Sequence, residues 1–143
     1  MSDLTKSTDM DFEATSLQRC ILIKDPDLVA GEALTKGMPC YIKSDGKVYK
    51  SVSTVATISN LTDCHGFAYD TYAIGDKVVL VADGGKMLYT AASGITPGAP
   101  YYVSDTAGKV SDAALVANDP PIALGISDTC LMISIIGRSS DVS

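Results

Sequence analysis

Short apolar stretches separated by glycine, proline and aspartate turns are the dominant pattern of this chain. The most apolar of them, residues 77–82 (KVVLVA), predicts a strand that is buried on both faces. No window of about a dozen residues carries a helical period, so we expect no long helix. The remaining stretches of branched and aromatic residues predict strands at 18–24, 40–42, 48–52, 53–61, 86–90, 101–103, 122–126 and 131–136.

The turn Asp25-Pro26-Asp27 is expected to end the first of these strands, because proline lacks the amide donor that a strand ladder uses. Residues 28–34, which follow, are compatible with one helical turn or with irregular chain. For the same reason Pro39 and Pro100 are expected at strand starts or sheet edges.

One segment of the sequence occurs twice. Residues 34–42 (LTKGMPCYI) are answered by residues 95–103 (ITPGAPYYV), and each copy continues through a polar turn into Gly-Lys-Val. A looser echo relates residues 65–68 to residues 124–127. A repeat of this kind sets the architecture of a chain. Together with the strand pattern, it predicts an all-β fold, a small barrel or sandwich built from two related β-units.

Composition divides the chain into an arm, a domain and a tail. Residues 1–16 are polar and acidic, and they predict an extended N-terminal arm without a core of its own. Residues 17–137 form a single predicted β-domain, with the internal repeat over about 34–89 and 95–137. Residues 138–143 predict a mobile tail.

Two interpretations of the arm remain open at this point. It is a frayed terminus, or it is a segment that becomes ordered on the surface of a partner. The second interpretation makes its larger apolar residues, Leu4, Met10 and Phe12, the candidate partner-binding residues.

The charge and hydropathy of the chain argue against nucleic acid and membranes as partners, and its cysteines are expected to stay reduced. The net charge of −6 over 143 residues argues against nucleic acid, whose binding needs clustered lysine and arginine. No stretch reaches the ~20 apolar residues of a membrane helix, and the polar N-terminus is unlike a secretory signal, so we expect synthesis in the cytoplasm and no membrane partner. The four cysteines are widely spaced, and in a reducing compartment they are expected to be buried thiols.

The candidates for chemistry are isolated. Asp63-Cys64-His65 could supply part of a metal site or of a nucleophile pair, but adjacent strand residues point to opposite faces, which favours a structural or surface His65. Asp83-Gly84-Gly85-Lys86 suggests a phosphate loop or a modified carrier lysine, although a hairpin turn explains the same residues. We therefore predict no catalytic residue, no metal and no cofactor, and expect that the chain is not an enzyme.

The tyrosines allow one further interpretation. They could line a carbohydrate-binding face, or they could pack across neighbouring strands with their phenol groups at the edge, which we favour. The residues concerned are Tyr41, Tyr49, Tyr101 and Tyr102.

The repeated segments resemble a known family. Residues 31–50 (GEALTKGMPCYIKSDGKVYK) are similar to the opening of phage head decoration (capsid cement) proteins. Residues 94–111 (GITPGAPYYVSDTAGKVS), followed by PPIALGISDT at 120–129, carry the same resemblance, which covers most of residues 17–136. Related patterns also occur in fibre and tail components of phages.

The resemblance implies a structural protein of the virion. Such a protein binds the outer surface of the head, usually as a homotrimer, and stabilises contacts between subunits of the major capsid protein. Its expected partners are the major capsid protein and other copies of itself. The alternatives are a phage tail or fibre adhesin or connector module and, less favoured, a carbohydrate-binding or carrier domain.

Overall fold

The computed structural model describes residues 3–53, 64–91, 93–114 and 120–135, which form an all-β protein with one four-residue helix, α1 (Ala14–Leu17). The all-β prediction is therefore confirmed. In chain order the strands are β1 (Asp11–Phe12), β2 (Leu22–Ala30), β3 (Pro39–Ile42), β4 (Lys47–Lys50), β5 (Gly66–Ala68), β6 (Lys77–Val81), β7 (Lys86–Leu88), β8 (Pro100–Val103), β9 (Val110–Ser111), β10 (Ala123–Gly125) and β11 (Cys130–Ile133).

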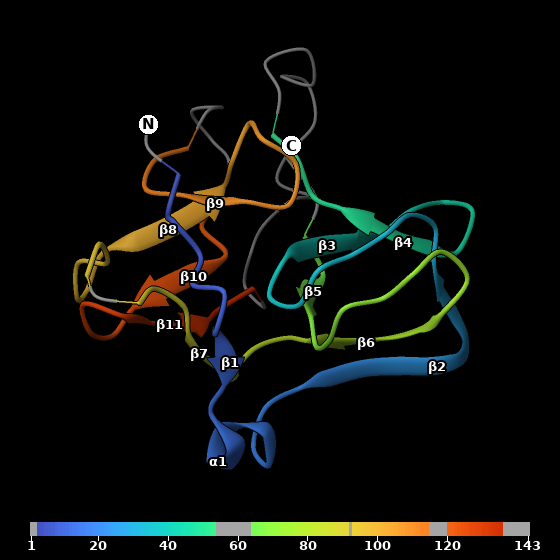
Figure 1. Ribbon diagram of the computed structural model, residues 1–143, viewed down its shortest axis with the longest axis horizontal. Helices are drawn as coiled ribbons and strands as arrows, with labels where there is room; N and C mark the ends of the chain where they lie inside the picture. Colours follow the sequence, from blue (N-terminus) through green and yellow to red (C-terminus); the bar gives the residue numbers. More distant parts are fainter. Residues whose placement is uncertain (1–2, 54–63, 92, 115–119, 136–143) are drawn as a thin grey trace.

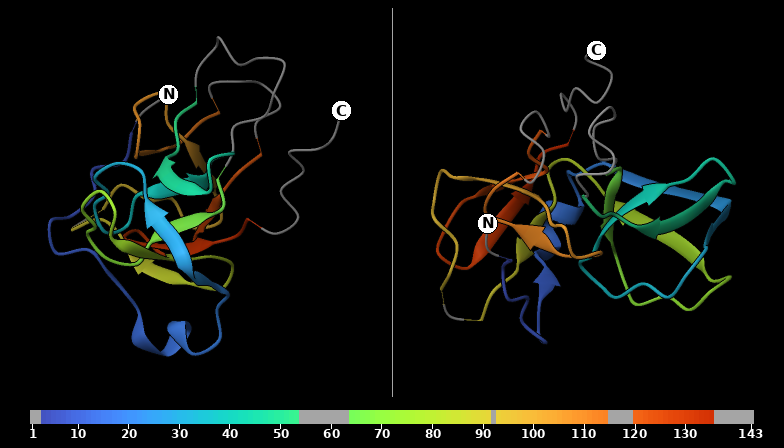
Figure 2. Two further views of the ribbon diagram at one scale, coloured as in Figure 1. Left: turned by 90° about the vertical axis from the view of Figure 1, so that its right-hand side faces the viewer. Right: turned by 90° about the horizontal axis from the view of Figure 1, so that it is seen from above.

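The strands form two barrel-like units that lie side by side (Figures 1 and 2). The first unit is a closed barrel with the strand order β2-β4-β3-β5-β6. The second is a six-stranded sheet with the order β1-β7-β11-β10-β8-β9, which curls into a half-barrel. Apart from β1, each unit uses consecutive strands, so the chain completes the first unit before it begins the second.

The two units have the same topology, as the sequence repeat predicts. The strand pairs β3–β4, β3–β5 and β5–β6 of the first unit recur as β8–β9, β8–β10 and β10–β11 of the second, all antiparallel. Strands β2 and β7 correspond as well, because each pairs antiparallel with the last strand of its unit. The boundary between the units therefore lies between β6 and β7, so residues 86–89 belong to the second unit and not to the end of the first.

Strand register fixes which residues of the two units correspond. Pro39 pairs with Phe67 in the first unit, and Pro100 pairs with Leu124 in the second. Both prolines begin their strands, where the missing donor breaks no ladder, as expected. Phe67 thus corresponds to Leu124. The looser similarity between residues 65–68 and 124–127 would instead have matched Phe67 with Ile126, two positions further along.

The turn that leads into β3 and β8 is also shared. Gly37 and Gly98 occupy it with φ angles of 84° and 83°, a conformation that residues with a Cβ rarely adopt. The repeated glycine therefore reflects one backbone geometry that is used twice.

Two local predictions differ from the structure. Asp25-Pro26-Asp27 does not end the first strand, because β2 runs through Pro26 to Ala30 with an irregularity in its pairing to β6 between Lys24 and Val29. Such a bulge leaves residues outside the ladder, so a proline without a donor is tolerated there. Residues 28–30 are consequently strand and not a helical turn.

The predicted extended arm contains the short helix α1 near its end. The carboxylate of Glu13 accepts hydrogen bonds from the N–H groups of Ser16 and Thr15 at 2.7 and 3.1 Å, and so caps the helix. The strand predicted at 53–61 falls largely on residues 54–63, and the tail predicted at 138–143 falls wholly outside the described residues.

Buried apolar side chains form two core clusters, one inside each unit. The cluster of the second unit also contains Phe67 and Val81, which come from the first unit. Strand β6 accordingly has apolar residues on both faces: Val78 and Leu80 point into the first barrel, while Val81 packs against the second unit. This confirms the burial predicted for the KVVLVA segment, and it means that β6 contributes to both core clusters.

Candidate functional site

The N-terminal arm spans the open side of the half-barrel. At one edge the Leu4 N–H donates to the carbonyl oxygen of Val110 in β9 at 2.8 Å. At the other edge β1 pairs with β7, and between them the Ser7 N–H donates to the Tyr89 carbonyl oxygen at 2.8 Å. The arm therefore connects both edges of the sheet by main-chain hydrogen bonds. In the first barrel the second half of β2 plays the equivalent part, by pairing with β4.

The three candidate partner-binding residues all contact the chain's own core. Met10 and Phe12 are buried in the core cluster of the second unit, and Leu4 is partly buried against it. The Phe12 ring also stacks on Tyr69, with 6.0 Å between the ring centroids. Binding of a partner through these residues remains a prediction, and it would require the arm to leave this position.

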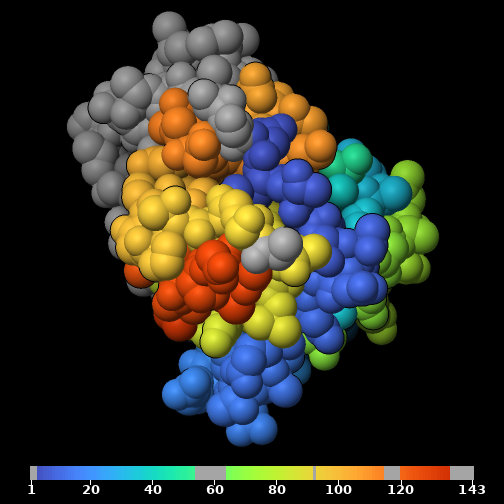
Figure 3. Space-filling view, turned by 60° about the vertical axis from the view of Figure 1, so that its left-hand side comes forward, coloured from blue at the N-terminus to red at the C-terminus, as the bar shows by residue number. Residues whose placement is uncertain are grey.

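Met10 brings the arm against the first barrel. A Cβ placed on Gly37 would lie 2.8 Å from the Met10 sulfur, so the methionine packs directly over this turn glycine. The arm consequently touches both units and lies along the surface between them, as the dark blue segment in Figure 3 shows.

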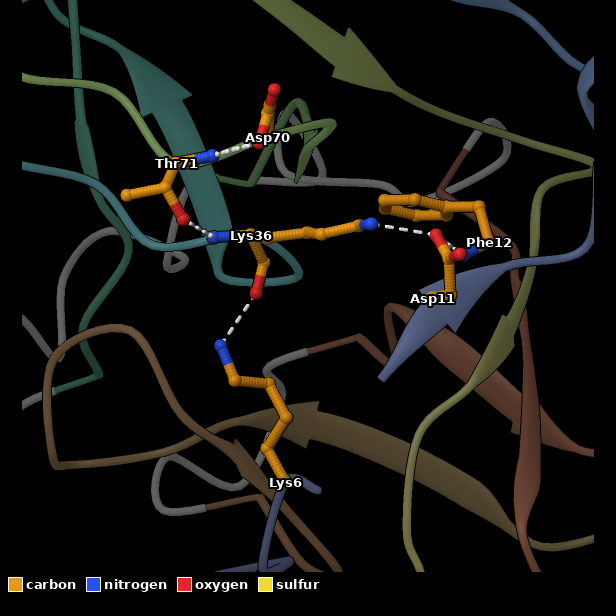
Figure 4. Close-up of polar contacts among 6 residues, drawn as sticks. All are labelled: Lys6, Asp11, Phe12, Lys36, Asp70 and Thr71. Carbon is orange, nitrogen blue, oxygen red and sulfur yellow. Dashed lines mark hydrogen bonds and ion pairs between the residues drawn. The ribbon is translucent and has the colours of Figure 1, made fainter. Parts of the chain in front are cut away.

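Lys36, in the turn before β3, is the polar centre of this junction (Figure 4). Its ammonium forms an ion pair with Asp11 Oδ1 at 2.6 Å, and its carbonyl oxygen accepts a hydrogen bond from Lys6 Nζ at 2.5 Å. The hydrogen bond from Lys36, with a further one from the Phe12 N–H, lowers the pKa of Asp11. Burial lowers the pKa of Lys6. One turn of the first barrel thus binds two side chains of the arm.

The Asp11–Lys36 ion pair makes stability depend on pH in the acid range. Because the pKa of Asp11 is lower in the folded chain than its ordinary value of 3.8, its contribution is present above that value. The contribution is lost as pH falls through the lower, folded pKa. Asp11→Asn should therefore reduce the free energy of unfolding at neutral pH by about 0.2–1 kcal/mol, a small effect because the carboxylate is solvent-exposed.

Urea unfolding of the wild type and of Asp11→Asn across the acid range tests this prediction. The difference between the two proteins should shrink toward zero as pH falls below the ordinary pKa of the carboxyl group. Asp9→Asn, at an exposed position of the same arm, is the control and should change little. A difference that grows on acidification would contradict the prediction.

A cavity of about 320 Å³ lies beside the arm. It is lined by arm residues 3–6, by Met38 and Tyr89, and by the turn 107–109 that precedes β9. Two of its polar groups already bond within the chain, since Asp3 accepts a hydrogen bond from Ser104 Oγ and Lys6 donates to Lys36. Burial raises the pKa of Tyr89, so its phenol stays protonated at neutral pH. The cavity is therefore part of the seam between the arm and the two units.

The residues considered for chemistry have structural positions. His65 is exposed, and its Nδ1 accepts a hydrogen bond from the Ile42 N–H at 2.9 Å, so the ring continues the β3–β5 ladder by one bond. Cys64 is buried, and the two neighbours therefore point away from any common site, as strand alternation predicts. Asp63 lies outside the described residues. Lys86 begins β7 directly after the Gly84-Gly85 turn. The turn is not the predicted hairpin, because β6 pairs with β2 and β5 while β7 pairs with β1 and β11, so it connects the two units.

No group of three or more potential metal ligands occurs among the residues that the structure describes. None of the four cysteines forms a disulfide, and Cys40, Cys64 and Cys130 are buried. Burial raises the pKa of the Cys40 thiol, which keeps it protonated and poorly reactive.

The four tyrosines do not form one face. Tyr41 and Tyr49 are cross-strand partners in β3 and β4, with their ring centroids 6.2 Å apart. The Lys43 ammonium lies over the Tyr49 ring, 5.0 Å from its centroid. The Tyr49 hydroxyl donates a hydrogen bond to Asp45 at 2.6 Å. Tyr101 is buried in the second unit. The cross-strand packing is confirmed for the first pair.

An exposed apolar surface on the second unit was not predicted from the sequence. We call it the outer apolar face; it consists of Leu88, Leu124, Ile126 and Met132, which are 45, 42, 40 and 37% exposed. Leu124 and Met132 are cross-strand partners in β10 and β11, on the side of the sheet opposite its core. The available signal was that 122–126 and 131–133 carry apolar residues at successive positions, too many for a strand with only one buried face.

Within the described part of the chain, no helix has both the length and the apolar character of a membrane span. Comparison of the chain with protein-family models, with curated protein sequences and with solved structures finds no match.

Proposed function

We propose that this chain is a structural, non-enzymatic phage capsid decoration protein, which binds the outer surface of the head and stabilises contacts between major capsid protein subunits. One observation carries the proposal. The two segments that resemble capsid cement proteins, 31–50 and 94–111, form equivalent parts of the two units: a turn followed by β3–β4 and by β8–β9. Both segments that carry the resemblance thus form the same structural element. Two segments that resembled the family by chance would not be expected to do so.

The architecture suits a cement protein in physical terms. Two units of one topology are packed together through Phe67 and Val81, so the chain can act as one block that spans two neighbouring capsid subunits. Many such blocks on one shell multiply weak individual contacts by avidity. The proposed activity needs neither a catalytic group nor a cofactor, and the partners are the major capsid protein and further copies of this chain.

The arm has a defined role in this proposal. While it occupies its observed position, it ties both units together through Lys36, β7 and β9. Leu4, Met10 and Phe12 could reach the capsid only after release from the core cluster, which exposes Met10 and Phe12 to water. Capsid binding through the arm would therefore require a binding surface on the capsid that is as apolar as the core cluster that these side chains leave.

Co-sedimentation tests the proposal. Purified protein is mixed with expanded, undecorated capsids, the capsids are pelleted, and the bound protein is quantified across a concentration series. Saturable binding at a fixed number of copies per capsid is expected, and an unrelated acidic protein of similar size should stay in the supernatant. Failure to pellet with the capsids at saturating concentration would refute the proposal. Electron microscopy of labelled virions would then decide for or against a tail or fibre location.

A further inference from the structure

The second unit has no closing strand of its own among the described residues. In the first barrel β2 closes the sheet, because its first half pairs with β6 and its second half pairs with β4. Its counterpart β7 pairs with the last strand of the second unit but ends at Leu88, and β9 lies at the sheet edge. The arm takes the missing place, since Asp3 and Leu4 bond to β9 and β1 pairs with β7. The half-barrel is therefore completed by a segment from outside the unit.

The arm contacts the rest of the protein as a bound peptide contacts a sheet. Main-chain hydrogen bonds hold it at both sheet edges, and Met10 and Phe12 are buried in the core cluster, at 6 and 5% exposure. Extended segments of a second chain bind sheets by this combination of main-chain bonds and anchored side chains. The partners of the arm described above lie between Lys36 and Ser111, beyond the residues that link the arm to β2. The arm of another copy would therefore find the same partners.

The link between the arm and the first barrel limits how an arm could reach another copy. α1 is attached to the second unit, because the Glu13 N–H donates to the Lys86 carbonyl oxygen at 2.8 Å and Ser16 Oγ accepts from the Lys86 N–H at 3.0 Å. The crossover would then lie in residues 18–21, which belong to neither helix nor strand. Four residues span at most ~13 Å when extended, so two copies that exchange arms must lie against each other.

Packing of the arm is incomplete in its N-terminal half. The cavity of about 320 Å³ lies beside residues 3–6, Asp3 and Thr5 are exposed, and Leu4 is only partly buried. Less apolar surface is removed from water here than at Met10 and Phe12, so this half detaches at lower cost. Release of the arm from its own chain can begin at this end.

We propose that neighbouring copies of this chain exchange arms, so that the arm of one copy closes the half-barrel of another. Exchange replaces each contact of the arm by the identical contact between chains, which makes it a low-cost route to association. Because every half-barrel receives one arm and every arm is used, the product is a closed oligomer. The inference rests on the self-association contained in the proposed function and names the segment that carries it.

Cross-linking between two variants of the full chain tests the exchange. Asp11 and Leu88 are exposed cross-strand partners of β1 and β7, so Asp11→Cys and Leu88→Cys place two thiols within reach of a disulfide. The two variants carry different tags, are co-expressed, and are oxidised with oxidised glutathione after purification. A disulfide that joins the two tags requires the arm of one chain to lie on β7 of the other.

The matched control combines Asp9→Cys, at an exposed arm position outside β1, with Leu88→Cys. The Asp11→Cys pair should give about tenfold or more of the mixed dimer than this control, because strand pairing holds its thiols together. Peptide mapping by mass spectrometry assigns the disulfide to positions 11 and 88 rather than to the native cysteines. Circular dichroism verifies that each variant is folded.

A single chain with both substitutions, Asp11→Cys/Leu88→Cys, gives a second measurement. Exchange predicts covalently linked chains on oxidation, and a wild type that is a closed oligomer by light scattering. If the thiols do not oxidise, a short bismaleimide cross-linker replaces the disulfide in both experiments. A mixed-dimer yield equal to that of the control would overturn the inference. So would a double variant that cross-links only within monomers, or a wild type that stays monomeric at its highest attainable concentration.

The outcome is separable from that of the capsid experiment. An arm-exchanged oligomer that does not sediment with capsids would end the capsid proposal and leave the exchange in place. A monomer that sediments with capsids would overturn the exchange and leave the capsid proposal in place.

Discussion

Phe67→Ala is expected to lower the free energy of unfolding by about 3–5 kcal/mol, the usual range for truncation of a fully buried phenylalanine. The loss should affect the whole molecule, because Phe67 lies on a strand of the first barrel but packs in the core cluster of the second unit. We therefore expect the variant to weaken the coupling between the units, so that unfolding becomes broader or separates into two transitions.

Internal duplication provides a matched control for this experiment. Leu124 occupies the corresponding position of the second unit and is exposed, so Leu124→Ala should change the stability of the monomer by less than about 1 kcal/mol. Urea unfolding followed by circular dichroism, at concentrations where the protein is monomeric, measures both variants. Similar losses from Phe67→Ala and Leu124→Ala would contradict the assignment of Phe67 to the contact between the units.

The second large effect is expected from Phe12→Ala, which should cost about 3 kcal/mol of unfolding free energy. The ring is buried in the core cluster and stacks on Tyr69, so its removal leaves a cavity and loosens the arm from both units. The arm should then be open to proteases for a larger fraction of the time.

Urea unfolding and limited proteolysis, with mass spectrometry of the products, measure the two consequences of Phe12→Ala. The first cleavages should map to the arm and should be much faster than in the wild type. Asp9→Ala, at an exposed arm position, should match the wild type in both assays. Unchanged stability together with an unchanged cleavage pattern would show that the arm does not hold the units together.

The fold was predictable from sequence where one residue type determines local geometry. Pro39 and Pro100 mark strand starts, Gly37 and Gly98 mark turns with positive φ, and β6 was evident from its unbroken apolar run. Because these signals occur in both copies, the sequence also predicted two related β-units.

The remaining features depend on contacts that local sequence does not encode. Pro26 has the character of a strand end, but a bulge keeps it within β2, and that bulge is set by the pairing with β6. The arm was predicted as extended, yet its position is determined by β7 and β9, far away in the chain. Correct placement of the outer apolar face required the strand register, because only the register shows which of two apolar neighbours, such as Leu131 and Met132, points outward.

The position of the arm has a consequence for biosynthesis. A ribosome makes the arm before the first barrel, but the strands that receive the arm, β7 and β9, are made only after that barrel. All strands of the first barrel are available before the second unit is synthesised. Met10 and Phe12, in contrast, stay exposed to solvent until the core cluster of the second unit forms. Contacts over so long a sequence separation also form slowly. The arm is thus placed later than the first barrel that follows it in the chain, and during this interval the nascent chain is exposed to aggregation or to exchange of arms with a neighbouring chain.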